Sequence, residues 1–175
     1  GQFDYSAGLL GAYTIKVALG KATISFSRAI VSGVLCNILV CIAVLMALCA
    51  KDIAGKLMAV FFTIMLFVVA GFEHCVANMY YLSAGIIAAV NPDYVEAAMA
   101  EYGYTAQQIS ALNWQSFLMG NLLPVTIGNI IGGMLFVALP LLYLHREQKA
   151  ENCSVKEKEY EHSFVFRRNT AGIGR

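Results

Sequence analysis

Long apolar blocks, interrupted at only a few positions, dominate this chain. The first block covers about residues 26–50, and its single charged residue, Arg28, lies near its start. A helix rises about 1.5 Å per residue, so a block of this length crosses a hydrocarbon layer about 30 Å thick. This block therefore predicts a transmembrane helix.

A second block, about residues 57–90, is too long for one straight crossing, and polar residues interrupt its middle. We interpret it as a helix broken near residues 67–74. A third block, about residues 117–144, contains prolines and glycines, which membrane helices tolerate where neighbours satisfy the freed backbone groups. The pattern thus predicts three crossings within a transmembrane region covering residues 26–144.

Small residues in the third block have two possible roles. Gly128 and Gly132 form a GxxxG pattern, which allows two membrane helices to approach closely. The same small size would also bring Asn129 or the backbone to a pore wall. Helix packing is the more common role, and the pattern by itself does not exclude the other.

The segments outside the blocks set the expected orientation. The tail, residues 145–175, and the short link after the first crossing are rich in Lys and Arg, whereas residues 91–115 carry acidic residues and no basic ones. The positive-inside rule places the tail and the link in the cytoplasm and the acidic loop outside. Residues 1–25 are interpreted as the end of a preceding helix followed by an external connector. In the alternative interpretation, Lys16 and Lys21 of this segment are simply solvated surface charges.

Composition agrees with a membrane setting and narrows the chemistry. Hydrophobic residues make up 59% of the chain and charged residues 13%, against about 25% charged in ordinary soluble domains. A net charge of +1 gives no indication of a nucleic-acid partner. The five cysteines show none of the CxxC spacing of a zinc or redox site. No metal and no cofactor are expected.

The pair Glu73-His74 is the candidate chemistry of the second block. An ionisable residue within a membrane segment is costly and is by default a functional-site hypothesis, here for a permeation path or proton relay. The unperturbed pKa of histidine, about 6.5, lies near physiological pH. A buried neutral histidine bonded to a backbone carbonyl is the alternative interpretation.

Two stretches of the chain carry a resemblance to a known family. GFEHCVANM at residues 71–79 and NLLPVTIGNIIGG at residues 121–133 resemble the two signature stretches of the formate/nitrite transporter family. The resemblance extends over about residues 21–144. It implies an all-α membrane protein with an aquaporin-like helical bundle and a broken pore-lining helix, assembled as a homopentamer in the plasma (inner) membrane.

The resemblance also implies which part of the family fold this chain provides. It resembles the second of two inverted repeats, so that a missing N-terminal repeat would be needed to complete the pore. The C-terminus would be cytoplasmic, and membrane lipid would surround the bundle.

Site residues are carried over by the same resemblance. His74 would be the central pore histidine, at the start of the second half of the broken helix. The N-terminus of this half-helix would point its free N–H groups and positive dipole end toward the site. The remaining pore positions would be an apolar constriction residue, two pore-lining asparagines and a lysine near the outer entrance: Phe67, Asn37, Asn129 and Lys21. Three residues would be structural neighbours of the site: Glu73, Gly71 and Asn78.

The function implied is passage of a small monovalent anion of a weak acid: formate, nitrite, hydrosulfide or lactate. His74 would assist by protonating the anion or by hydrogen bonding to it, and no enzymatic activity is expected. Two alternatives are a membrane subunit of a redox enzyme and a non-transporting interaction subunit. Haem between helices usually requires paired histidines, whereas His74 is the single histidine of the predicted membrane region.

Overall fold

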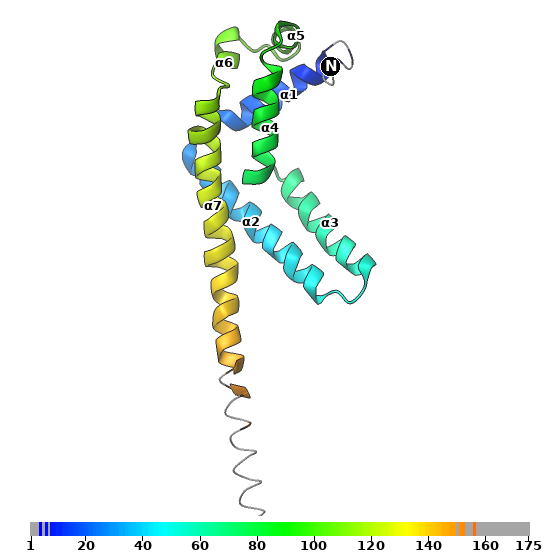
Figure 1. The fold of residues 1–175 in the computed structure, drawn as a ribbon, viewed down its shortest axis with the longest axis vertical. Helices are drawn as coiled ribbons and strands as arrows, with labels where there is room; N and C mark the ends of the chain where they lie inside the picture. The colour runs from blue at the N-terminus through cyan, green and yellow to red at the C-terminus, as the bar shows by residue number, and fades with distance from the viewer. Residues whose placement is uncertain (1–3, 5, 7, 150, 153–155, 157–175) are drawn as a thin grey trace, which may run out of the picture. The chain divides into compact units, whose positions relative to one another are not determined.

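The computed structural model describes residues 4, 6, 8–149, 151–152 and 156, and it divides into two units, Gly1–Phe136 and Val137–Arg175. The described part of the first unit consists of helices joined by short non-helical segments (Figure 1). Its elements are α1 (Leu9–Ala22), α2 (Phe26–Cys49), α3 (Ile53–Val69), α4 (Cys75–Ala88), α5 (Pro92–Tyr102), α6 (Ala106–Ser110), a π-helical segment η1 (Ser116–Leu122) and α7 (Leu123–Gly133); a second π segment, η2 (Met134–Ala138), begins in this unit.

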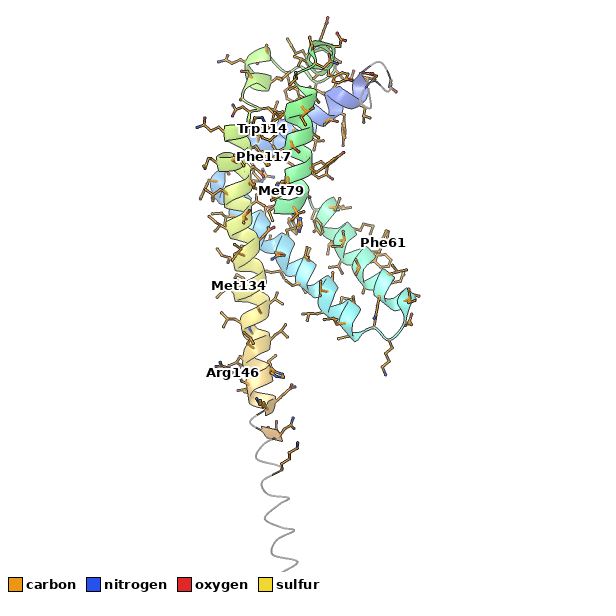
Figure 2. All side chains as sticks on the ribbon, in the orientation of Figure 1. Phe61, Met79, Trp114, Phe117, Met134 and Arg146 are labelled. Atoms are coloured by element: carbon orange, nitrogen blue, oxygen red, sulfur yellow. The ribbon has the colours of Figure 1, made fainter. Side chains whose placement is uncertain are left out.

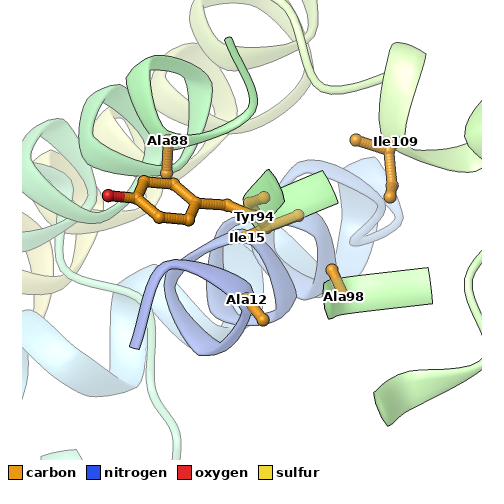
Figure 3. Packing of buried hydrophobic residues seen from close by; sticks show 6 residues of the cluster. All are labelled: Ala12, Ile15, Ala88, Tyr94, Ala98 and Ile109. Atoms are coloured by element: carbon orange, nitrogen blue, oxygen red, sulfur yellow. The ribbon is translucent and has the colours of Figure 1, made fainter. Parts of the chain in front are cut away.

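Helix α1 packs against α4 and α5 and forms the centre of the core. One apolar cluster joins Ala12 and Ile15 of α1 to residues of α4, α5 and α6 (Figure 3). A second cluster, one to two turns further along α1, packs Ala18 and Leu19 against α4, Leu112 and η1. A helix of 14 residues, too short to cross a bilayer alone, is thereby held by burial of one face.

Helices α2 and α7 approach each other closely because glycines line their contact. A Cβ atom added to Gly128 would lie 2.3 Å from the carbonyl oxygen of Ile30, and one added to Gly132 would lie 2.3 Å from that of Val34. No side chain fits at either position without moving a backbone. The GxxxG pattern therefore serves helix packing, as the more common of the two interpretations predicted.

A short turn joins α2, which ends at the C-cap Ala50, to α3, which a polar residue of the turn caps. Asp52 is the N-cap of α3, and its carboxylate accepts a hydrogen bond of 2.8 Å from the Gly55 N–H. Beyond this turn, the side chains on the outer face of α3, including Phe61, project away from the rest of the unit and are exposed (Figure 2). A soluble domain would bury such a face, whereas lipid or a further protein surface can cover it.

Two helical runs in the described residues, Phe26–Cys49 and Ser116–Lys149, are long and apolar enough to cross a membrane. The second block is divided between two shorter helices, α3 and α4, with the interruption after Val69. Between α4 and η1, Pro92 is the first residue of α5, behind Asn91 as its N-cap.

The second unit, taken by itself, continues as helix through residues 139–149. Most of the predicted charged tail, residues 145–175, including residues 157–175, lies outside the described residues.

Replacing Gly128 by Ala tests the close helix contact. The added methyl group would collide with the Ile30 carbonyl, and we expect a loss of about 1–3 kcal/mol in the free energy of unfolding, as for other overpacked cores. Thermal denaturation of the detergent-solubilised full-length protein measures the loss.

Gly20→Ala is the matched control, because a Cβ atom at this exposed α1 position meets nothing within 4 Å. It should leave the protein as stable as wild type or slightly more stable, since alanine favours helix. Equal destabilisation by both variants would contradict the packing role of Gly128.

Candidate functional site

Two helix interruptions face each other in the first unit. Residues 23–25 separate α1 from α2, and residues 70–74 separate α3 from α4. A groove of about 800 Å³ lies between them. Residues of both interruptions and of the first turns of α2 line this groove, among them Thr23, Ser25, Arg28, Ser32, Gly71 and Glu73.

The end of α3 is fixed by a glycine turn. Gly71 has a φ of 69°, in the left-handed region that favours glycine. The Phe72 N–H donates to the Phe67 carbonyl at 3.0 Å and the Gly71 N–H donates to the Val68 carbonyl at 3.1 Å, the two bonds of a Schellman motif. Gly71 is therefore the residue that ends the helix and directs the chain into the interruption.

His74 is the N-cap residue of α4, and this position settles its tautomer. Its Nδ1 accepts a hydrogen bond of 3.3 Å from the Ala77 N–H, so in the neutral ring the proton is on Nε2. Within the described part of the chain no hydrogen bond is made to Nε2. The ring of Phe67, which is 9% exposed, stacks on the imidazole with centroids 5.9 Å apart. His74 thus offers one N–H donor beside an apolar wall.

Next to His74, a buried ion pair connects the end of α1 to the second interruption. The Lys21 Nζ donates to both carboxylate oxygens of Glu73, at 3.0 and 3.1 Å, and the two side chains are 19% and 7% exposed. The Asn78 amide donates to the same carboxylate at 2.5 Å and to the Asn121 Oδ1 at 2.7 Å. Asn121 in turn donates to the Lys21 carbonyl at 2.9 Å, which closes a ring of contacts.

On the other side of the interruption, Asn129 of α7 holds three backbone groups. Its amide nitrogen donates to the carbonyls of Gly33 and Glu73, at 3.0 and 3.1 Å, and its Oδ1 accepts from the Cys75 N–H at 3.1 Å. Asn37 donates to the Asn129 backbone carbonyl at 2.5 Å. Both asparagines therefore connect helices, as polar side chains between membrane helices commonly do.

These contacts change two of the expectations drawn from sequence. The N–H groups at the start of α4 were expected to point toward a ligand, but those of Cys75 and Ala77 are bonded to Asn129 and His74. The alternative of Lys21 as a solvated surface charge is wrong, because its ammonium is paired with Glu73. Nearby side chains thereby satisfy the N–H groups of Glu73, Cys75 and Ala77, which would be costly to leave unpaired.

Two further residues of this site had no assigned role in the sequence. Asn121 is fully buried and bonds to both α1 and α4. The Ser32 hydroxyl of α2 accepts the Glu73 N–H at 3.0 Å. The sequence could have indicated Asn121, because an asparagine within an apolar block is unusual. It gives no comparable indication for Ser32.

The fold and the site define a class: an all-helical membrane protein in which a histidine and a carboxylate lie at a helix interruption. The family model for the formate/nitrite transporter matches residues 1–143. The chain is 35% identical over 144 residues to the uncharacterized transporter YrhG of Bacillus subtilis, covering 82% of this chain and 46% of that protein. It is 36% identical over 146 residues to the formate channel FocA of Haemophilus influenzae, covering 82% and 50%.

Solved structures give the same result. A pentameric formate channel with formate bound matches with a TM-score of 0.72 and 35% identity, over 82% of this chain and 56% of that one. An ion channel of the same family matches with a TM-score of 0.52 and 30% identity, over 75% and 45%. The chain belongs to the formate/nitrite transporter family. It spans about half the length of the curated relatives it matches.

The contribution of the buried ion pair can be measured with a double-mutant cycle. Lys21→Met leaves the Glu73 carboxylate without its cation, and Glu73→Gln leaves the Lys21 ammonium without its anion. Each single variant should lose about 3 kcal/mol in the free energy of unfolding, because a buried charge without its partner is costly. The double variant should recover much of that loss in denaturant titrations. Strictly additive losses would show that the two charges do not interact.

Proposed function

We propose that this chain forms part of a transmembrane channel or transporter for small monovalent anions of weak acids, such as formate, nitrite, hydrosulfide or lactate. The observation that carries the proposal is His74 at the helix interruption, with Nδ1 occupied by the Ala77 N–H and Nε2 free of partners in the described residues. Family membership and relatives named as formate channels support the substrate class.

An anion in an apolar constriction faces a large cost of desolvation, and this cost falls sharply if the anion is protonated or receives a hydrogen bond. The neutral His74 ring offers its Nε2–H to an anion oxygen, and the imidazolium form offers a proton. Phe67 stacked on the ring provides the apolar wall that excludes water and limits size. Histidine and phenylalanine together therefore favour a small acid over a hydrated ion.

Lys21 contributes to the path through its partner. Because its ammonium is paired with Glu73, the pair adds little net charge, yet it places a cation and an anion close to the His74 backbone. In this proposal Asn37 and Asn129 hold the wall of the path in place.

The assembly is part of the same proposal. The chain supplies one half of a protomer, a further repeat completes the pore, and five protomers assemble in the plasma membrane with the C-terminus in the cytoplasm. The pentameric formate channel among the structural matches supports this arrangement. The exposed apolar faces of α2, α3 and α7 provide surfaces for the second repeat, neighbouring protomers and lipid.

The histidine is tested by His74→Asn in the full-length protein, reconstituted in proteoliposomes. Asparagine keeps a side-chain acceptor for the N-cap and removes the titratable ring. Uptake of formate measured between pH 5 and 8 should lose its pH dependence while the protein still assembles. His145→Asn, outside the site, is the control and should retain the wild-type profile. A wild-type profile in His74→Asn would remove the histidine from the proposed role.

The constriction is tested by Phe67→Ala. Removing the ring that stacks on His74 should widen the path and raise the ratio of lactate to formate uptake by roughly tenfold, equivalent to about 1.4 kcal/mol of barrier difference. Phe61→Ala, on the exposed face of α3, is the matched control and should leave the ratio unchanged. Equal ratios in both variants would count against Phe67 as a size filter.

A further inference from the structure

The π-helical segment η1 departs from regular helix geometry next to the site. Its last turn is closed by a bond from the Leu123 N–H to the Leu118 carbonyl, five residues back. Pro124 follows directly; it has no N–H, and its ring would crowd the carbonyl of Gly120 in an α-helix. A wider turn relieves that crowding. It also turns the residues before it by about 100° relative to a regular helix, the angle of one extra residue.

The residue placed by this turn is Asn121. It is 0% exposed, and both functional groups of its amide are used. Its Oδ1 accepts from Asn78 on α4, and its Nδ2 donates to the Lys21 carbonyl at the end of α1. Asn121 is therefore bonded to two residues that contact Glu73: to the side chain of Asn78 and to the backbone of Lys21.

The orientation of the Asn78 amide leaves one of its buried polar atoms without a hydrogen bond, which is energetically unfavourable. Both of its amide hydrogens are donated, one to Glu73 and one to Asn121, while its buried Oδ1 has no hydrogen-bond partner among the described residues. Rotating the amide would turn Oδ1 toward two acceptor oxygens. The two acceptors thus dictate the orientation of Asn78, and unsatisfied buried atoms of this kind are uncommon and are found at functional sites.

We propose that Asn121 is a positioning residue of the anion path, which holds Asn78, and through it the Glu73 carboxylate and the Lys21 ammonium, beside His74. This inference rests on the function proposed above. Asn121 does not touch the permeating anion; it acts through Asn78. The π turn exists, in this view, to bring an asparagine of the α7 side to that position.

The charged and titratable groups around this site are few among the described residues. Lys21 comes from α1, Arg28 and the Cys36 thiol from α2, and Glu73 and Cys75 from the interruption and the start of α4. Tyr81 of α4 places its ring 5.6 Å from the Lys21 ammonium. Neither η1 nor α7 carries a charged residue. Because so few charges lie nearby, a change in the hydrogen bonds of the Glu73 carboxylate should alter the electrostatic environment of His74.

The test compares Asn121→Ala, Asn78→Ala and the double variant in proteoliposomes of the full-length protein. With fewer hydrogen bonds accepted, the Glu73 carboxylate exerts more of its negative charge on His74 and favours the protonated ring. The pH of half-maximal formate uptake should rise by roughly half a unit in each single variant. Because both residues act through one carboxylate, the double variant should shift no further than Asn78→Ala alone.

Gln115→Ala is the matched control, since it removes an exposed amide that makes no cap hydrogen bond at the start of the same segment. A wild-type midpoint in Asn121→Ala, or shifts that simply add in the double variant, would overturn the proposal. If Asn121→Ala fails to assemble, Asn121→Leu replaces it, because leucine keeps a similar volume and removes the oxygen that accepts from Asn78. The midpoint should rise as in Asn121→Ala, and an unchanged midpoint would overturn the proposal equally.

His74→Asn, measured alongside, separates the two levels of the argument. Loss of pH dependence in His74→Asn together with a wild-type midpoint in Asn121→Ala would reject the positioning role and leave the proposed function standing. A wild-type profile in His74→Asn would reject the function itself.

Discussion

The buried ion pair between Lys21 and Glu73 is the contact on which the rest of this arrangement depends. Both helix interruptions leave backbone groups that the hydrocarbon of a membrane cannot satisfy. The pair connects the last turn of α1 to the second interruption, and asparagine amides complete the hydrogen bonds around it. Without a cation at this point, the Glu73 carboxylate would be an uncompensated buried charge, so the two breaks are energetically linked.

Close helix packing allows short asparagine side chains to reach backbone groups on neighbouring helices. Asn129 reaches carbonyls of α2 and of the interruption only because α2 and α7 lie almost backbone to backbone, at Gly128 and at Gly33. The same holds between α1 and α4, where a Cβ atom added to Gly85 would lie 2.1 Å from the Ala18 Cβ. Small residues and asparagines therefore act together. The small residues let the helix backbones approach, and the asparagine side chains form hydrogen bonds with backbone N–H and C=O groups.

Two polar side-chain atoms at the site make no hydrogen bond among the described residues: the Nε2 of His74 and the buried Oδ1 of Asn78. Around the interruption, the side chains of Glu73, Asn129 and Asn121 are bonded within the bundle, as are the N–H groups of Cys75 and Ala77. His74 Nε2 has no such bond in the described residues. Of these two atoms, Nε2 is the donor. A donor beside an apolar ring suits a small ligand with an acceptor group, in keeping with the family to which this chain belongs.

The sequence by itself determined the long apolar blocks and hence the all-helical membrane class, because hydrocarbon thickness fixes how many apolar residues a crossing needs. It also singled out the Glu73-His74 pair, since ionisable residues are rare in such blocks. The partners were decided by the tertiary structure alone. Lys21 and Glu73 are 52 residues apart and Asn121 bonds to a carbonyl 100 residues away; no local pattern encodes such pairings, which follow from how helices pack. For the same reason, the first helix gained a buried role that its length and two lysines had not indicated.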